Sequence, residues 1–485
     1  MLSQTTGVKM ASLFRKTSRN AFRSLLLVSA VFVAGCVQVP DLGPLPARKP
    51  VEILTAEESF RAPVAEWPSD RWWTGYGDAQ LALLIDEALA DSPDLAQAQA
   101  RLRKAEGAAQ QVGAALLPQV QAKGSATEFT LNSDRRIAGL NPNGGNDLSR
   151  GSLNFDYEID FWGKNHALLA AATSTAEAAR ADAAAARLAL STAIASSYAD
   201  LAQLYGDRDA GVDALRVRSD TASLLEERQS QGLENQGAVK SADAARAAAE
   251  AQLASVNESI ALTKNRIAAL MGAGPGRGLS IARPAPSIKA FGLPPNVQSD
   301  LLGRRPDVAA ARLRAEAAAR GIDAAKADFY PNVNLSAALG INTFALNSLG
   351  RSTSEYAAFG PAVSLPIFSG GRIEGAYREA RAEYDASVAV YNSTLDQALR
   401  DVADAATSSR ALGERLATSR DALMASEDAY RIVQNRYLGG LATYLEVLSA
   451  EDSLIANRRA VTDLETRAFA LDVALIRALG GGYQS

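Results

Sequence analysis

The sequence has little of what a metal or redox protein needs. It contains one Cys and one His in 485 residues, whereas zinc, iron and copper sites are built from clusters of Cys, His and carboxylate ligands. A single Cys also cannot form a disulfide bond within the chain. We therefore expect no metal site, no resident cofactor and no internal cross-link.

Two further absences narrow the class of protein. The formal net charge is only −4, and Lys and Arg are scattered among Asp and Glu, so the chain has no basic stripe of the kind that binds a nucleic-acid backbone. Its 47% hydrophobic and 21% charged residues argue against both a disordered chain and a conventional bundle of membrane-spanning helices. We expect a folded protein without a nucleic-acid partner.

The first positive feature is a processing segment at the N-terminus. Basic residues precede the apolar run 25–33, which leads into Ala34-Gly35-Cys36, and this pattern resembles a secretory signal with a lipoprotein box. Small residues fit a narrow peptidase site, and the Cys36 thiol is the nucleophile that would accept a lipid. We expect cleavage after residue 35, with a diacylglycerol and an N-acyl chain on Cys36.

The alternative is a short membrane anchor with an incidental Cys. The apolar run falls well short of the ~20 residues that a spanning helix needs, which favours the lipoprotein interpretation. Val37 stands where an Asp often retains bacterial lipoproteins in the inner membrane. Its presence favours the outer membrane as the destination.

The remainder of the chain is duplicated. Pro93 and Pro118 open and close one segment, Pro306 and Pro331 another, and each pair is 25 residues apart. The later matches all have an offset of 208, against 213 for the first segment: Trp162-Gly163-Lys164 with Gly370-Gly371-Arg372, Arg228 with Arg436, Gly232-Leu233 with Gly440-Leu441, and Gly272 with Gly480. One loop-length change after Pro118 explains the difference, as expected for a true duplication.

Each copy is predicted to contain the same elements in the same order. A helix of about 35 residues comes first, followed by two strands, a helix of about 65 residues without a breaker, and a shorter returning helix. The expected ranges are 81–115 and 298–328 for the first helices, 163–232 and 371–440 for the long helices, and 238–271 and 443–479 for the returning helices. Frequent Ala lets such helices pack closely side by side, which suits a helical wall or coiled coil.

Apolar and polar residues alternate over 153–161 and 333–341. We expect four strands of 10 to 14 residues per chain, each with one apolar and one polar face, which is long enough to cross a bilayer at a tilt. Four strands are too few to close a barrel, and an open edge in lipid leaves backbone groups unpaired. Several chains must therefore share one barrel.

These residues resemble the TolC-like outer-membrane efflux proteins, and specifically the NodT-type lipoprotein branch. The motifs behind the resemblance are Trp72-Trp73, Gly77-Asp78-Ala79-Gln80-Leu81, Leu84-Ile85, Asp160-Phe161-Trp162-Gly163-Lys164, Leu301-Leu302-Gly303-Arg304-Arg305-Pro306-Asp307-Val308 and Leu365-Pro366-Ile367-Phe368-Ser369-Gly370-Gly371. The resemblance implies a mainly α fold with a transmembrane β-barrel: a homotrimer with a 12-stranded barrel, a 12-helix periplasmic tunnel and an equatorial region. It also implies a periplasmic adaptor (membrane fusion protein) and an inner-membrane pump as partners.

The domain boundaries follow from these assignments. They are 1–35 for the signal peptide, 36–80 for the lipid anchor and N-terminal equatorial tether, 81–272 for the first efflux repeat, 273–297 for a linker, 298–480 for the second repeat and 481–485 for a C-terminal tail.

The helical hairpins are predicted to turn at Gly232-Leu233 and Gly440-Leu441. Gly permits the turn and Leu offers an exposed apolar side chain. The alternative is a plain helical turn with a Gly cap. Because the Gly-Leu pair occurs in both copies, and relatives meet the adaptor at these turns, we expect these four residues to dock the adaptor.

The copies differ beside the turn, where Tyr437 and Glu446 occupy the positions of Gln229 and Ala238. Threefold symmetry would make Glu446 a ring of three charges that attracts cations. We therefore expect the second hairpin to line a closed periplasmic aperture. In the family a second acidic position often follows three residues later, but here it is Ser449, which puts a double acidic ring in doubt. An exposed helical Glu without a gating role is the alternative.

The predicted function is that of an outer-membrane channel subunit that passively conducts small toxic compounds, and not that of an enzyme. The rivals are a type I protein-secretion duct and a non-conducting helical structural lipoprotein. Two lipid-length strand pairs between helices argue against a structural stalk. An enzyme such as a peptidoglycan hydrolase needs a convergent acid or nucleophile cluster, and the sequence shows none.

Overall fold

The computed structural model describes residues 39–50, 58–130, 145–288, 291–343 and 355–484. It forms two compact units: residues 1–47, 105–176 and 314–388 belong to the first, and residues 48–104, 177–313 and 389–485 to the second. Cys36, the predicted lipidation residue, lies outside the described residues.

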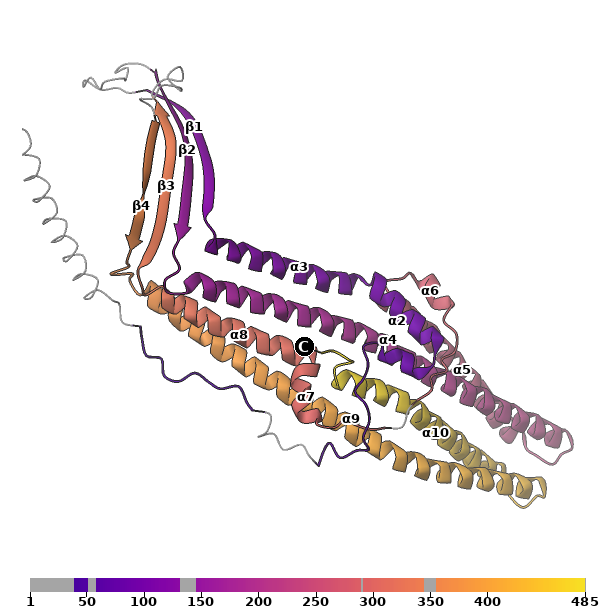
Figure 1. Cartoon of the computed structure of the whole chain (residues 1–485). Helices are drawn as coiled ribbons and strands as arrows, with labels where there is room; N and C mark the ends of the chain where they lie inside the picture. Colours follow the sequence, from indigo (N-terminus) through magenta and orange to yellow (C-terminus); the bar gives the residue numbers. More distant parts are fainter. Residues whose placement is uncertain (1–38, 51–57, 131–144, 289–290, 344–354, 485) are drawn as a thin grey trace, which may run out of the picture. The chain divides into compact units, whose positions relative to one another are not determined.

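The described part of the chain is mainly helical and contains four strands (Figure 1). In chain order the elements are η2 (Trp72–Tyr76), α2 (Ala79–Asp91), α3 (Pro93–Gly113), η3 (Ala114–Leu116), β1 (Gln119–Thr130), β2 (Gly145–Glu158), α4 (Lys164–Ser230), α5 (Gln236–Leu270), α6 (Pro275–Leu279), α7 (Val297–Arg304), α8 (Pro306–Ala327), β3 (Asn332–Thr343), β4 (Glu355–Ser364), α9 (Arg372–Leu438) and α10 (Tyr444–Ala478). Within the described residues, none of the helices combines the length and the apolar character that a transmembrane helix requires.

The four strands form one antiparallel sheet in the first unit, in the order β1-β2-β3-β4 (Figure 1). Their lengths of 12, 14, 12 and 10 residues confirm the predicted range. Among the described strands, β1 and β4 each pair on one side only. The sheet therefore has two edges whose backbone groups have no partner strand within the described chain.

The register separates the side chains of the sheet into two faces, because cross-strand partners project to the same side. Leu153 pairs with Ala122 and with Leu339, and Ala337 pairs with Phe155 and Phe359. The opposite face is mostly polar and includes Gln119, Gln121, Lys123, Ser125, Asn154, Asp156, Asn334 and Ser336. The predicted alternation is confirmed, and it produces one apolar and one polar face.

The alternation at 153–161 suggested a strand that runs through Phe161, but β2 ends at Glu158. The N–H of Ile159 still donates to the carbonyl of Val333 at 2.9 Å. The N–H of Phe161 instead donates to the carbonyl of Ile159. Gly163 has a φ of +73°, a conformation that side chains disfavour and that redirects the chain into α4.

The two long helices have the same length and a constant offset. Helices α4 and α9 have 67 residues each, α5 and α10 have 35 each, and the bounds of each pair differ by 208 positions. The prediction of two long helices with shorter returning helices is therefore confirmed. Gly206 stands inside α4 because a Cβ there would lie 2.5 Å from Cγ2 of Thr462, so glycine permits α10 to approach.

The prediction of one continuous helix over 81–115 and another over 298–328 was wrong. Both are broken, the first between α2 and α3 at Ser92 and the second between α7 and α8 at Arg305. Ser92 and Arg305 are extended, with ψ of 124° and 119°. The cause is the following proline, which disfavours the helical conformation of its predecessor and has no N–H to donate.

The second unit contains the main hydrophobic cores. One is aromatic and gathers Trp72, Trp73 and Tyr76 against Tyr198 and Phe469; the ring centroids of Tyr76 and Phe469 are 4.9 Å apart in an edge-to-face arrangement. The other packs α7 and the start of α8 on α9 and on the end of α10. These cores hold η2, α2 and α7 against the long helices.

The stretch 273–297, predicted to be a linker, contains packed structure. It includes α6, and Leu293 forms an isolated parallel bridge with Val64. The N–H of Leu293 donates to the carbonyl of Pro63 at 2.8 Å. The connection between the two copies is thereby fixed to the N-terminal segment.

Residues 39–50 contact side chains of α9. In the first unit Arg381 donates to the carbonyls of Gly43 and Pro44, and in the second unit Lys49 forms an ion pair with Asp396 at 2.7 Å. The N-terminal segment is therefore held by side chains of one helix rather than by backbone pairing.

Candidate functional site

The predicted docking residues lie at the ends of the two helical hairpins. Gly232 and Gly440 both have a φ of +74°, and the N–H groups of Leu233 and Leu441 each donate to the carbonyl five residues earlier at 2.8 Å. This is the helix-ending motif in which Gly takes the left-handed position. Leu233 and Leu441 are 60% and 73% exposed, so both turns present an apolar side chain to solvent.

Tyr437, predicted to line the aperture, is buried in the single chain, with 4% of its surface exposed. Its hydroxyl donates to Oε2 of Glu234 at 2.7 Å, and the guanidinium of Arg228 lies 4.7 Å from the ring centroid. Burial, followed by the nearby Glu234 carboxylate, raises the pKa of Tyr437 to about 12. Tyr437 therefore fastens the second hairpin to the first.

Glu446 is exposed and belongs to the N-terminal cap of α10. The N–H of Thr443 donates to Oε2 of Glu446 at 2.6 Å, and the N–H of Glu446 donates back to Oγ1 of Thr443 at 3.4 Å. The hydrogen bonds that Oε2 accepts from the N–H of Thr443 and, at 3.0 Å, from its hydroxyl lower the pKa of Glu446, so the carboxylate is favoured. Ser449, one turn later, is also exposed. Glu446 and Ser449, like Tyr437, remain predicted aperture residues.

A buried ionic cluster between α4 and α10 was not predicted from the sequence. The side chain of Arg218 is 10% exposed and contacts Oε1 of Glu451 at 2.9 Å, and it also pairs with Asp452. Oγ1 of Thr221 donates to Oε2 of Glu451 at 3.2 Å. Glu451 is completely buried, so the first and second hairpins share a charge pair that is almost removed from water.

Two opposing effects act on the pKa of the Glu451 carboxyl. Burial raises its pKa, while Arg218 and Thr221 favour the carboxylate and reduce that shift. A comparison of the copies singles out Arg218, because Ser426 stands at its equivalent position, whereas Asp243 at the position of Glu451 is also acidic. Burial, however, cannot be read from that comparison alone.

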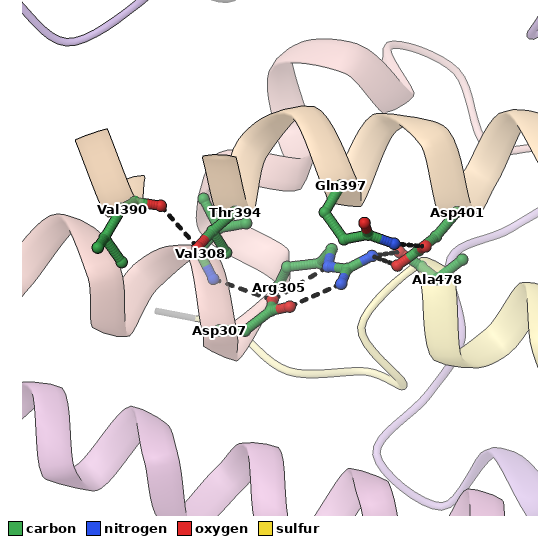
Figure 2. Close-up of polar contacts among 8 residues, drawn as sticks. All are labelled: Arg305, Asp307, Val308, Val390, Thr394, Gln397, Asp401 and Ala478. Carbon is green, nitrogen blue, oxygen red and sulfur yellow. Dashed lines mark hydrogen bonds and ion pairs between the residues drawn. The ribbon is translucent and has the colours of Figure 1, made fainter. Parts of the chain in front are cut away.

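A second ionic cluster lies at the break between α7 and α8, as Figure 2 shows. The guanidinium of Arg305 contacts Oδ2 of Asp307 at 2.6 Å and Oδ2 of Asp401 at 3.0 Å, and it donates to the carbonyl of Ala478 at 3.3 Å. One side chain thereby joins α8, α9 and the last turn of α10. The Arg-Pro-Asp motif in the sequence indicates the helix break, but it does not reveal the partners of Arg305 on α9 and α10.

Arg305 also borders a cavity of 710 Å³ between α4, α8, α9 and α10. Asp404 and Arg477 lie on its wall beside the Arg305 pairs. The opposite charges of the wall nearly balance, so the cavity favours water or neutral polar groups over a strongly charged ligand. Within the described residues, no set of three or more His, Cys, Asp or Glu side chains is arranged to hold a metal ion.

The sequence profile of a family described as outer membrane efflux protein matches residues 84–273 and 297–481 of this chain. Among curated proteins, the fusaric acid resistance protein FusA of Burkholderia cepacia is 36% identical over 364 residues, which are 74% of this chain and 68% of that protein. The multidrug resistance outer membrane protein MdtP of Escherichia coli K12 is 29% identical over 470 residues, covering 95% and 96% of the two chains.

Solved structures give a similar result. The crystal structure of the outer membrane protein VceC of Vibrio cholerae aligns with a TM-score of 0.82 and 49% sequence identity. The alignment covers 86% of this chain and the whole of that chain. The mainly helical fold with a four-stranded sheet is therefore shared with solved proteins of this kind.

Proposed function

Because the chain belongs to the outer membrane efflux protein family and is an outer-membrane efflux channel subunit, we propose that three copies assemble into one passive duct. The observation that carries this proposal is the sheet. It has an apolar face, a polar face and two edges without a partner strand in the described chain.

The physical argument concerns the unpaired edges. In lipid, each backbone N–H or C=O without a hydrogen bond costs several kcal/mol. Pairing β1 of one copy with β4 of the next satisfies both edges, and three copies supply 12 strands, enough for a closed barrel. The apolar face then meets lipid and the polar face surrounds water.

The sheet offers a matched pair of variants on neighbouring residues of β4. Phe359 is 90% exposed on the apolar face, whereas Ala358 lies on the polar face. We expect Phe359→Arg to cost about 2–4 kcal/mol of membrane stability and to reduce the yield of inserted trimer. We expect Ala358→Arg to leave trimer and conductance intact, because its charge meets water. Equal effects of the two variants would contradict the assigned faces.

The hairpin ends are proposed to dock a periplasmic adaptor, which in turn contacts an inner-membrane pump. Replacing an apolar side chain in a protein interface by a charged one weakens the binding of the partner. We expect Leu233→Asp and Leu441→Asp to weaken adaptor binding at least tenfold in a pull-down titration. Leu262→Asp, at a residue of α5 that is equally exposed, is the control and should bind normally. Normal binding by both turn variants would exclude docking there.

Tyr437, Glu446 and Ser449 are proposed to line the closed aperture in the trimer. Three carboxylates on one axis attract cations and repel one another. We expect Glu446→Gln to reduce the cation preference of single channels and to raise the fraction of time spent open. Unchanged selectivity and gating would leave Glu446 with its helix-capping role alone.

The cargo is proposed to be small toxic organic compounds, since the matched relatives are named for fusaric acid and multidrug resistance. Deletion of the gene followed by a broad susceptibility screen tests this. We expect increased sensitivity to at least one antibiotic, dye or organic acid, restored by the intact gene. No change in susceptibility together with loss of a secreted protein would support type I secretion instead.

A lipid on Cys36 is proposed as the membrane anchor. Residues 39–50 are the first described residues after Cys36, and they contact side chains of α9. Metabolic labelling with radioactive palmitate should mark the parent protein and not Cys36→Ser. Equal labelling of both would place the acyl chain elsewhere.

A further inference from the structure

A cluster of aromatic and cationic side chains lies at one end of the sheet, where the strands meet the helices. Glu158, the last residue of β2, pairs with Asn334 near the start of β3, and Asn332 pairs with Ser364 at the end of β4. The chain segments that follow β2 and β4 and precede β3 therefore lie at the same end of the sheet (Figure 1).

Trp162 and Tyr330 form the aromatic part of this cluster. Their ring centroids are 4.7 Å apart and the rings are nearly parallel, at 18°. The indole N–H of Trp162 donates to the carbonyl of Pro331 at 2.7 Å, yet the residue remains 51% exposed. A fixed, half-exposed Trp-Tyr pair is typical of the boundary between lipid tails and headgroups.

A cavity of 630 Å³ adjoins this pair. Its charged wall consists of Arg320, Asp323 and Lys326, with the ring of His166 beside them. Arg320 contacts Asp323 at 3.5 Å, whereas Lys326 forms no ion pair within the part of the chain that the structure describes. Two permanent cations therefore face one carboxylate, and the cavity favours an anionic ligand.

The position of His166 is fixed by Asp160, which follows β2. The backbone N–H of His166 donates to Oδ2 of Asp160 at 2.9 Å, and the ring Nδ1 of His166 lies 2.6 Å from the same oxygen. Burial opposes the ionised carboxyl, but the bonds from His166 prevail and hold the pKa of Asp160 below its usual value. The imidazole is thus oriented with most of its surface exposed.

Apolar side chains surround the same end of the sheet. Phe161, Ile367 and Phe368 are 65%, 72% and 91% exposed. Such exposure of large apolar side chains in a soluble setting is costly, and it indicates contact with lipid or protein. An anionic head and apolar tails together describe a phospholipid.

The other copy has no such site. Gly370 and Glu374 stand at the positions of Trp162 and His166, and Leu117 and Gly113 at those of Tyr330 and Lys326. The aromatic pair and Lys326 are therefore features of one strand-to-helix junction, not of the repeat as such.

We propose that the cavity beside Trp162 and Tyr330 binds the phosphate-bearing headgroup of an anionic phospholipid, with Lys326 and Arg320 as its cationic ligands. The proposal rests on the proposed function, since it requires this end of the sheet to lie at the membrane boundary. Each chain contributes one site, so a trimer holds three.

The test uses purified, full-length trimer reconstituted into vesicles of phosphatidylcholine and phosphatidylglycerol, in which either lipid carries bromine on its acyl chains. Bromine quenches nearby tryptophan, and Trp162→Phe identifies the contribution of Trp162, because the other three tryptophans, Trp67, Trp72 and Trp73, all belong to the second unit. We expect phosphatidylglycerol to be preferred at Trp162, by about fivefold for each contributing cation.

Lys326→Gln with Arg320→Gln should abolish this preference while quenching by total lipid persists. The matched control is Arg372→Gln, which removes an exposed cation at the junction of β4 and α9 and should keep the preference. Equal quenching by both lipids in the parent would overturn the proposal. An equal loss in Arg372→Gln would also overturn it, because general attraction to the charged rim would then suffice.

Two further measurements separate the remaining outcomes. Inorganic phosphate added in excess should not displace the lipid; displacement would show a free-anion site and overturn the headgroup assignment. Single-channel conductance of the same variants separates the two proposals. Intact conductance without lipid preference would refute this site alone, whereas failure of the parent to insert would refute the proposed function.

Discussion

The first half of the chain (79–270) and the second half (297–478) have closely similar backbones but differ in the side chains that fasten them. Helices α4 and α9 match in length, as do α5 and α10. Around η2 and α2, the first half relies on aromatic rings that pack edge to face and on the hydrogen bond that the Tyr198 hydroxyl donates to Asp78. At the equivalent break, the second half relies on the guanidinium of Arg305.

The comparison shows how two copies of one structural unit acquire different side-chain contacts. The repeat of glycines, prolines and apolar positions preserves the backbone, because these residues set turns, breaks and helical faces. A few substitutions then create contacts that exist once per chain, such as Arg218 with Glu451 and Tyr437 with Glu234. The second half contributes the buried acid and the buried ring, and the first half contributes their partners.

The largest expected effect comes from the buried pair between the halves. Arg218→Met leaves the carboxylate of Glu451 buried without its cation, which costs about 3–5 kcal/mol, and we expect a large drop in melting temperature measured by circular dichroism in detergent. Ser426→Ala, at the equivalent position of α9, should cost less than about 1 kcal/mol.

A double variant makes this prediction sharper. Arg218→Met combined with Glu451→Leu removes both charges, and apolar replacements of a buried pair are often neutral or stabilising. We therefore expect the double variant to regain most of the lost stability. If it is as unstable as Arg218→Met alone, packing rather than charge explains the loss.

The next effect concerns the two helix breaks. Arg305→Met removes a cation whose partners, Asp307 and Asp401, are about one third to two fifths exposed, so we expect a smaller cost of about 2 kcal/mol. Ser92→Ala at the equivalent break should change the free energy of unfolding by under about 1 kcal/mol. Thermal unfolding of both variants in one detergent measures the contrast, and equal losses would contradict the ionic role.

The hairpin ends provide a third contrast. Tyr437→Phe keeps the ring but removes the hydroxyl that donates to Glu234, at a cost of about 1 kcal/mol. We expect more frequent channel opening in single-channel recordings, because the hairpins are held less tightly. Gln229→Ala, the equivalent position of the first half, should behave like the parent. A parent-like Tyr437→Phe would show that this bond does not restrain the tip.

The smallest expected effect is one of pH dependence. Burial raises the pKa of Glu451, so its ionisation opposes folding, and this destabilisation appears as the pH rises from the ordinary value of 4.5 to the higher folded value. Glu451→Gln lacks this titration. We therefore expect its stability relative to the parent to improve as the pH rises through that window, as measured by thermal unfolding.

Glu446 on the same helix should behave in the opposite way. Its pKa is lowered by the bonds with Thr443, so its stabilising contribution is present above the ordinary value and is lost as the pH falls through the lower folded value. Glu446→Gln should therefore lose stability relative to the parent at neutral pH and approach it on acidification. The same direction for both variants would contradict the assigned environments.

Much of the fold was predictable from local pattern. Alternation predicted β2 and β3, unbroken helical spacing predicted α4 and α9, and paired glycines predicted both hairpin turns. The breaks at Ser92 and Arg305 were not predicted, although Pro93 and Pro306 disfavour the helical conformation of the residue before them.

The sequence by itself determined the elements, their order and the positions of the turns, since these depend on spacing and on the backbone limits of glycine and proline. Only the tertiary structure decided which charges meet. It buried Glu451 against Arg218, turned Tyr437 toward Glu234 and brought Lys326 beside Trp162 and Tyr330. Burial and pairing depend on neighbours from distant parts of the chain, and no local pattern contains that information.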